Sequence, residues 1–136
     1  MARYGVIVDG RKGAYGVVIP DLPGCVAMGK TTDEALRNAA SCAVEWAELA
    51  HTKGMPIRKP RSLDDLRTDP EVAAELADGG TLALVSVILD SARAVKANVS
   101  LDSALLDELD AAAALKKLTR SAFIASAVRE KILAEG

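Results

Sequence analysis

The chain has few of the residues that build zinc sites or disulfide scaffolds. Its 136 residues include one histidine, His51, and two cysteines, Cys25 and Cys42, which lie far apart in the sequence. Without a C-x-x-C pair or partner histidines, this spacing does not fit a zinc centre. We expect both cysteines to be small, buried or partly buried thiols in a reducing compartment, and we expect neither a metal nor a cofactor.

Long apolar runs are missing as well. No stretch of ~20 apolar residues is present, as a helix that spans a bilayer would require. The first residues do not resemble a secretory signal, because Arg3, Asp9, Arg11 and Lys12 interrupt the apolar positions. We therefore expect a cytoplasmic protein that does not bind a membrane.

The chain also lacks an excess of positive charge. Its net charge of −2 and pI near 5.4 argue against a basic protein that binds nucleic acid non-specifically. The charge is nevertheless uneven, with ten basic and thirteen acidic residues through Asp90, and seven basic and six acidic residues after it. Half of the residues are hydrophobic, which suffices for one ordinary domain or two small ones. The short polar run 90–93 predicts two domains, residues 1–90 and residues 91–136.

The first part begins with a predicted β-hairpin. Residues 3–9 and 15–19 alternate apolar and small or polar side chains, and the turn-forming run 10–13 separates them. A turn with two prolines follows, in which Gly24 can take a positive φ, and residues 26–29 can form a third strand.

A long helix is predicted next. Thr31 and Glu34 have the spacing of a capping box, and Gly54 and Pro56 end the helical pattern. The apolar stripe is wide enough to cover one face of a small sheet. It consists of Leu36, Ala39, Ala40, Ala43, Trp46, Ala47 and Ala50.

Residues 56–80 read as a surface connection with short helices over 63–67 and 71–77. Residues 81–89 then predict a fourth strand, which is apolar at nearly every position and hence buried on both faces or central in the sheet. The order β-β-β-α-β predicts an α+β fold, with a small antiparallel or mixed sheet and one long helix.

The last part has the pattern strand, helix, helix. Over residues 94–101 the apolar side chains Val95, Ala97, Val99 and Leu101 alternate with polar ones, as in a strand with two different faces. Asp102 offers a helix cap, and a second helix opens at residues 119–121. The apolar positions of the two helices recur at helical spacing. They are Leu105, Leu106, Leu109 and Ala113, then Phe123, Ile124, Ala127, Val128 and Ile132.

About 40 residues are too few to build a core alone, so a second copy of the tail is needed. Two such strands paired across a two-fold axis would cover the helices with their apolar faces, and their polar faces would form a ribbon that fits the DNA major groove. Residues 93–133 thus resemble the ribbon-helix-helix repressors, which dimerise and bind operator DNA.

This resemblance assigns two sets of candidate DNA contacts. Lys96, Asn98 and Ser100 would face the base edges. Residues 119–121 would bind phosphate at the start of the second helix; they are Thr119, Arg120 and Ser121. The alternatives are a solvated strand face for the first set, and a helix cap with two surface residues for the second.

The whole pattern resembles the HicB family of antitoxins. The resembling residues are 20–25 (PDLPGC), 29–36 (GKTTDEAL) and the apolar strand that leads into the C-terminal motif. Membership would imply a partial ribonuclease-H-like fold in the first part, a small HicA-like ribonuclease toxin as partner, and repression of the antitoxin's own operon. We expect a homodimer, or a tetramer through contacts of the first part, and no enzymatic activity.

Two other functions remain open at this stage. The first part could sense a small molecule in place of a toxin, which requires an enclosed pocket with convergent polar groups. It could also be a metal-dependent nuclease, which requires several carboxylates close together. The candidates Asp9, Asp21, Glu45 and Glu48 have no spacing that predicts convergence, and turn, cap and surface roles are expected for them. His51, near the end of the long helix, is expected to be solvated or to compensate the helix dipole.

Overall fold

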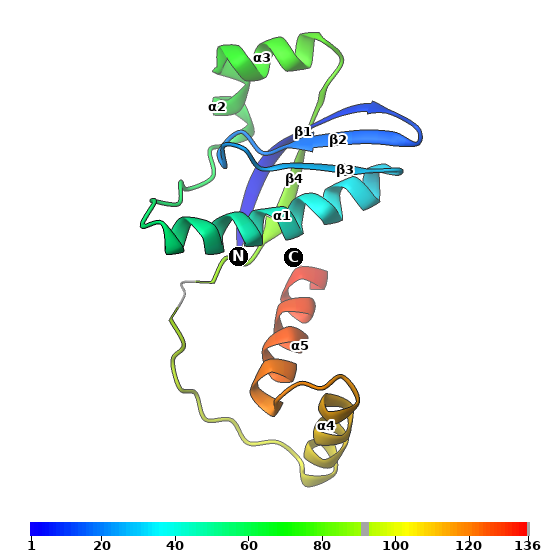
Figure 1. Cartoon of the computed structure of the whole chain (residues 1–136), viewed down its shortest axis with the longest axis vertical. Helices are drawn as coiled ribbons and strands as arrows, with labels where there is room; N and C mark the ends of the chain where they lie inside the picture. Colours follow the sequence, from blue (N-terminus) through cyan, green and yellow to red (C-terminus); the bar gives the residue numbers. More distant parts are fainter. Residues whose placement is uncertain (91–92, 136) are drawn as a thin grey trace. The chain divides into compact units, whose positions relative to one another are not determined.

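The computed structural model describes residues 1–90 and 93–135 of the chain (Figure 1). The chain divides into two compact units, Met1–Ala92 and Arg93–Gly136, and each is described by itself. Among the described residues, no helix combines the length and the apolar character needed to cross a membrane.

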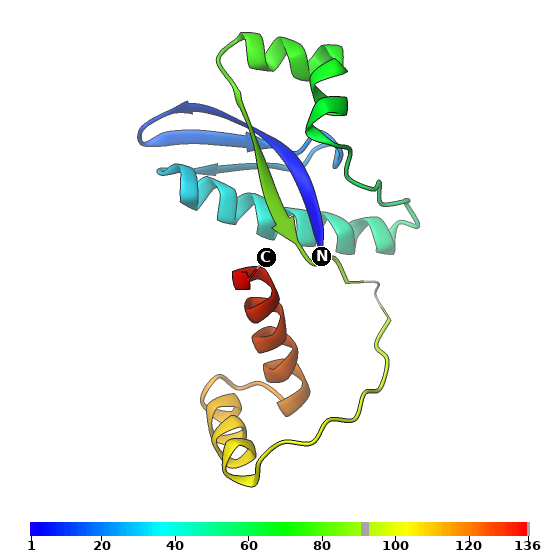
Figure 2. The same ribbon diagram turned by 180° about the vertical axis from the view of Figure 1, so that it is seen from behind.

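A four-stranded antiparallel sheet forms the centre of the first unit (Figures 1 and 2). Its strands are β1 (Ala2–Arg11), β2 (Ala14–Val18), β3 (Val26–Gly29) and β4 (Thr81–Val87), in the spatial order β3-β2-β1-β4. The hairpin β1–β2 pairs Arg11 with Ala14, and β3 continues the sheet by pairing Val26 with Val18. The predicted α+β fold and antiparallel sheet are thus confirmed.

The long helix α1 (Thr32–Thr52) covers one face of the sheet. Its buried residues are all alanines, so the helix approaches the strands closely; they are Ala35, Ala39, Ala43, Ala47 and Ala50. Against them pack apolar side chains that share one face of the strands, among them Tyr4, Val6, Val17 and Val85.

Local chemistry fixes the start of α1. The Thr31 Oγ1 atom accepts a hydrogen bond from the Glu34 backbone N–H at 3.1 Å, as the predicted cap requires. Gly29 lies directly beneath this first turn, and a Cβ atom at that position would collide with the backbone of Ala35. Glycine therefore allows β3 and α1 to meet. In the preceding turn Gly24 has the expected positive φ of 86°.

Two short helices cover part of the opposite face of the sheet. They are α2 (Leu63–Thr68) and α3 (Pro70–Ala77), and they bury Leu66 and Val72 against Ile7 of β1. Asp69 begins α3, since its side chain accepts a hydrogen bond from the Glu71 N–H at 2.9 Å. The sheet thus has a core on each face.

The position of β4 excludes one of the two predicted alternatives. The strand is apolar at most positions, but it lies at the edge of the sheet and pairs only with β1 among the described strands. Val85 and Val87 pack towards α1, whereas Leu82 faces the core under α2 and α3. Helices on both faces explain the apolar pattern, so a central place in the sheet is not needed.

The second unit contains α4 (Ser103–Leu115) and α5 (Arg120–Glu135). The Asp102 side chain caps α4 by accepting a hydrogen bond from the Ala104 N–H at 2.9 Å, as predicted. Residues 93–102 have no regular secondary structure in the single chain, and their side chains are exposed. The strand expected over 94–101 depends on pairing with a second copy, so it stays a prediction.

Candidate functional site

The three predicted base-contacting residues lie on the segment that precedes α4. Lys96, Asn98 and Ser100 are all exposed, and no described element covers them. Their side chains alternate with those of Val95, Val99 and Leu101, which are apolar and also exposed. The segment thus has one polar and one apolar side, and both are open to solvent. Such a segment can pair with another strand, bury its apolar side and leave its polar side free to contact a ligand.

An apolar groove lies beside this segment in the second unit. Its volume is about 520 Å³. Apart from Glu108 its lining is apolar, and both helices and the end of the segment contribute to it. The apolar lining residues are Val99, Leu101, Leu105, Leu109, Ala112, Phe123, Ile124, Ala127 and Val128. Ala113 is the one residue of α4 or α5 that is buried in the described chain.

The predicted phosphate-contacting residues cluster at the start of α5. Thr119 Oγ1 accepts a hydrogen bond from the Ala122 N–H at 3.1 Å, so Thr119 caps the helix. Ser121 is exposed in the first turn. The first backbone N–H groups of any helix have no intrahelical partner and carry the positive end of the dipole, so this end suits an anion.

Arg120 has a protein partner that the sequence did not predict. Its guanidinium donates to both carboxylate oxygens of Asp110, with Nε–Oδ1 and Nη2–Oδ2 distances of 2.9 Å. These hydrogen bonds lower the pKa of Asp110 from its ordinary value. The pair joins α4 to α5, and Arg120 is therefore oriented by Asp110 at the edge of the candidate phosphate site.

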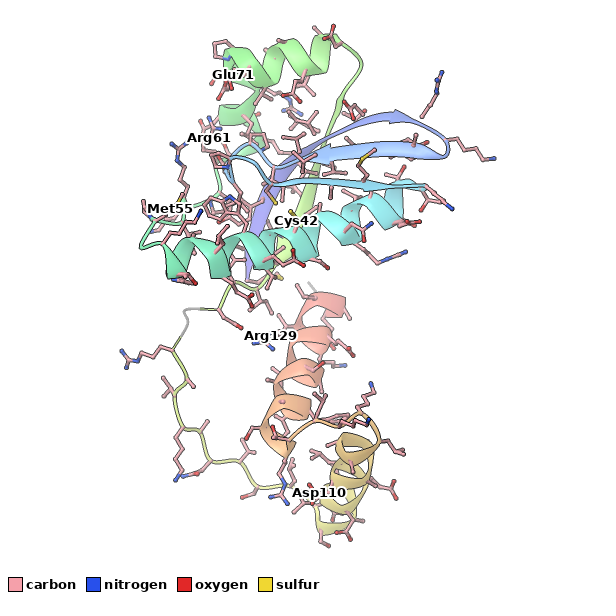
Figure 3. The ribbon with its side chains drawn as sticks, in the orientation of Figure 1. Cys42, Met55, Arg61, Glu71, Asp110 and Arg129 are labelled. Carbon is pink, nitrogen blue, oxygen red and sulfur yellow. The ribbon has the colours of Figure 1, made fainter. Side chains whose placement is uncertain are left out.

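In the first unit, Asp21 has a structural partner. Its carboxylate is 1% exposed and accepts hydrogen bonds from the Arg61 backbone N–H at 2.8 Å and from Arg61 Nε at 2.6 Å. Arg61, which is labelled in Figure 3, also donates from Nη1 to Asp69 at 3.0 Å, and this hydrogen bond lowers the pKa of Asp69. Asp21 thus ties the turn before β3 to the segment before α2.

The other candidate carboxylates do not gather around it. Asp9 is an exposed residue of β1, and Glu45 and Glu48 are exposed on α1. Within residues 1–90 and 93–135, no three His, Cys, Asp or Glu side chains are grouped so that they could hold a metal ion. The described geometry therefore offers no support for the metal-dependent nuclease.

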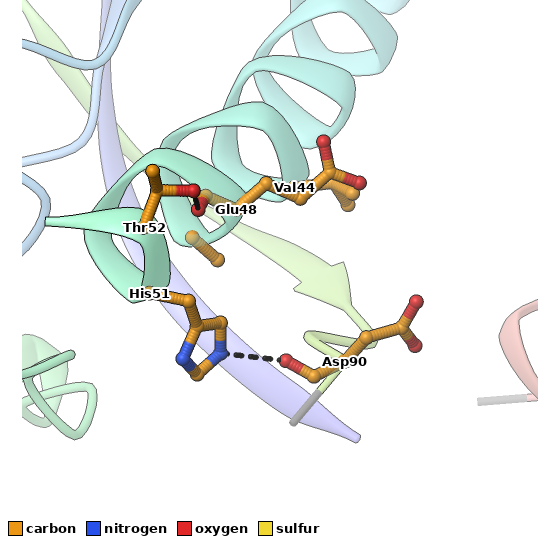
Figure 4. A pocket seen from close by; sticks show the side chains of 6 residues that line it. Val44, Glu48, His51, Thr52 and Asp90 are labelled. Carbon is orange, nitrogen blue, oxygen red and sulfur yellow. Dashed lines mark hydrogen bonds between the residues drawn. The ribbon is translucent and has the colours of Figure 1, made fainter. Parts of the chain in front are cut away.

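A cavity of about 420 Å³ lies at the end of α1 (Figure 4). His51 Nε2 donates a hydrogen bond to the Asp90 carbonyl oxygen at 2.9 Å, and Thr52 Oγ1 donates to the Glu48 carbonyl at 3.0 Å. Two of its polar side chains are thus engaged within the protein. The bond to Asp90 is the specific role of His51, which helix position alone did not predict.

The sheet has an exposed apolar surface that was not predicted from the sequence. Ala27 packs towards α1, so its neighbours Val26 and Met28 point to the opposite face, where they are 56% and 68% exposed. α2 and α3 cover this face at β1 and β4 but leave these two side chains open. The alternation of side chains along β3 could have placed Val26 and Met28 on one face. How much of that face α2 and α3 cover could not be inferred from the sequence.

Comparison with known proteins identifies relatives of the whole chain. A family model described as "HicB_like antitoxin of bacterial toxin-antitoxin system" matches residues 4–128. The crystal structure of the Burkholderia pseudomallei antitoxin HicB is 33% identical, with a TM-score of 0.56 over 96% of this chain and 98% of that chain.

Two further structures match the fold of a large part of the chain. The N-terminal domain of the same Burkholderia antitoxin is 31% identical, with a TM-score of 0.51 over 64% of this chain and 99% of that one. A chain of a HicA3 and HicB3 toxin-antitoxin complex is 23% identical, with a TM-score of 0.53 over 63% of this chain and 98% of that one. No curated protein sequence shows significant similarity.

Proposed function

The chain belongs to the family of HicB-like antitoxins of bacterial toxin-antitoxin systems, and we propose that it neutralises a small HicA-like ribonuclease by direct binding and represses its own operon. The observation that carries the proposal is the family match over residues 4–128, which spans both units. In this proposal the first unit binds the toxin, the second unit binds DNA, and neither is an enzyme.

The toxin-binding half is supported by the surface of the first unit. Residues 1–90 carry thirteen acidic and ten basic residues, a balance that complements a nuclease whose own surface must bind RNA phosphates. The HicA3 and HicB3 complex contains a chain whose fold matches this one. We propose that the toxin docks on the sheet face that carries the exposed apolar side chains of Val26 and Met28.

The DNA-binding half depends on the second unit. We propose that two copies pair their segments 94–101 antiparallel, so that Val99 and Leu101 close the apolar groove of α4 and α5. The polar side chains of the resulting ribbon, Lys96, Asn98 and Ser100, would then enter the major groove. Thr119, Ser121 and the first N–H groups of α5 would bind phosphates, and a homodimer is the smallest assembly that can do so.

Co-purification tests the toxin-binding half. The chain is expressed with a tagged, catalytically inactive product of the neighbouring reading frame, and the molar mass of the eluted complex is measured by light scattering. We expect a stable complex with the wild-type chain. Met28→Glu is expected to weaken it by tenfold or more, because a charge on the apolar surface must be desolvated in the interface.

Leu49→Glu is the matched control, since it places the same charge at an exposed apolar site on α1. It is expected to leave the complex intact. Equal loss with both variants would show that the docking surface is elsewhere. Failure of the wild-type chain to capture the toxin, together with repression by the chain alone, would favour the sensing of a small molecule.

A further inference from the structure

The two cysteines of the chain meet in the first unit, beneath the turn that leads into β3. Cys25 Sγ donates a hydrogen bond to Cys42 Sγ across 3.1 Å, and both residues are free thiols. Cys42 also donates to the Val26 carbonyl oxygen at 3.7 Å. Figure 3 marks Cys42 on α1, beside the sheet. A disulfide has an S–S length of about 2.05 Å, so the sulfur atoms need to approach by only about 1 Å.

The backbones on both sides are already held in place. The turn is closed by hydrogen bonds from the Cys25 N–H to the Leu22 carbonyl at 2.9 Å and from the Ile19 N–H to the Cys25 carbonyl at 3.1 Å. One helical turn beyond Cys42, Trp46 Nε1 donates to the Pro23 carbonyl oxygen at 2.9 Å. Because the turn and α1 are fixed to each other independently of the thiols, the short sulfur contact is part of the fold.

The two thiols differ in their access to solvent. Cys25 is 1% exposed, whereas Cys42 is partly exposed. Burial, together with the hydrogen bond to Cys42, raises the pKa of Cys25 to about 12. Because the thiolate is the reactive form of cysteine, a dissolved oxidant meets Cys42 first. Cys25 is then the nearest nucleophile to any adduct formed on Cys42.

We propose that Cys25 and Cys42 form a redox-active pair, which a small-molecule disulfide such as glutathione disulfide converts to an intramolecular disulfide. The Cys42 thiolate attacks one sulfur of the oxidant, whose S–S bond breaks and releases one thiolate. Cys25 gives up its proton and attacks Cys42 Sγ, which releases the second thiolate. The protein loses two electrons and two protons, and the oxidant is reduced to two thiols.

The second step takes place between sulfur atoms that are already in contact. Two of the influences that raise the pKa of Cys25 come from Cys42, its hydrogen-bonding sulfur and its charge as a thiolate. Both weaken once Cys42 is bound in a mixed disulfide, whereas burial, the largest cause of the raised pKa of Cys25, remains. The attack is also intramolecular between groups that already touch, which gives a high effective concentration.

The bond would connect the turn before β3 to the middle of α1 and close a loop between residues 17 positions apart. A cross-link of this kind restricts the unfolded chain more than the folded one, so oxidation should stabilise the first unit. It would also fix the start of β3, the strand that carries Val26 and Met28.

The full-length chain tests the proposal. Reduced protein is equilibrated in glutathione buffers of increasing redox potential, its free thiols are blocked with a maleimide under denaturing conditions, and its mass is measured. We expect one transition to a chain that has lost two hydrogen atoms and carries neither maleimide nor glutathione. This product should contain no disulfide between chains. The melting temperature should rise with it, and dithiothreitol should reverse both changes.

Single variants separate the two thiols. Cys25→Ala should accumulate glutathione on Cys42, whereas Cys42→Ala should leave Cys25 unmodified because it is buried. The proposal is overturned if the wild-type chain keeps both thiols in the most oxidising buffer, retains glutathione on Cys42, or forms only disulfides between chains.

Discussion

Among residues 1–90 and 93–135, Asp21 is the only charged residue that is buried. An isolated carboxylate at such a site would be costly, but two hydrogen bonds from Arg61 compensate it. One of the two comes from the backbone of Arg61, so the contact fixes the course of the chain as well as a side chain. The same residue was considered above as a metal ligand, and its partner gives it a structural role.

Replacing Asp21 should therefore affect stability rather than chemistry. Asp21→Asn loses the charge of the acceptor and should lower the free energy of unfolding by about 2 kcal/mol. Trp46 is the only tryptophan and lies in the first unit, so its fluorescence in a urea titration reports that unit. Asp64→Asn is the control, since the Asp64 side chain is 95% exposed in its pair with Arg67. An equal decrease in the free energy of unfolding in both variants would show that the buried contact of Asp21 with Arg61 contributes no more than an exposed ion pair.

Asp110 and Arg120 give a prediction about pH. The folded-state pKa of Asp110 is lowered by the hydrogen bonds from Arg120, so its stabilising contribution is complete above the unfolded-state pKa. That contribution is lost as the pH falls through the lowered folded-state value. In Arg120→Ala the titration midpoint of Asp110, followed by carboxyl carbon NMR, should rise towards that of an unpaired aspartate. An unchanged midpoint would show that the pair does not form in solution.

At the scale of elements, the segment 94–101 and the N-terminus of α5 form the proposed DNA reader. A base contact determines which sequence is bound, whereas a phosphate contact only positions the protein. In the proposed reader Asn98 would make a base contact, because an amide can both donate to and accept from an adenine edge. Thr119 would support a phosphate contact, because it caps the helix end that is proposed to bind phosphate.

Asn98→Ala should weaken binding to the operator by about 1 to 3 kcal/mol and leave non-specific binding unchanged. Fluorescence anisotropy with operator and scrambled duplexes at one salt concentration measures both affinities. Lys12→Ala, in the exposed turn between β1 and β2, is the control and should change neither. A parallel loss on both duplexes would indicate that Asn98 contacts the backbone of DNA and not a base.

The elements also show how far a sequence predicts a structure. The cap at Thr31, the apolar stripe of α1 and the β1–β2 hairpin follow from local spacing, and the structure confirms them. The place of β4 at the sheet edge did not follow, since an apolar pattern reports burial and not the order of neighbours. The Asp110–Arg120 pair joins two helices across a turn, so helical spacing could not reveal it. The base contacts expected for Lys96, Asn98 and Ser100 stay predictions.

At the scale of the whole molecule, the account needs two copies of the chain. The second unit leaves an apolar groove open, and large side chains around it are exposed, such as Leu105 at 55%. Burial of apolar area contributes about 25 cal/mol per Å², so a second copy packed on this groove would substantially stabilise the second unit of each chain. A dimer formed in this way would also give the proposed DNA reader two-fold symmetry.

Leu105→Lys should convert the dimer into a monomer, because it puts a charge into the groove. Leu115→Lys is the control, since Leu115 is 87% exposed and does not line the groove. Sedimentation velocity over a range of concentrations distinguishes the two states. If both variants remain dimers, the copies associate through another surface.

The most direct test of the central claim is amide hydrogen exchange over residues 94–101 of the full-length chain. If two tails pair as a ribbon, these amides exchange slowly in the wild-type dimer and quickly in Leu105→Lys, because the hydrogen bonds exist only between copies. Rapid exchange in a wild-type chain that sedimentation shows to be dimeric would contradict the account.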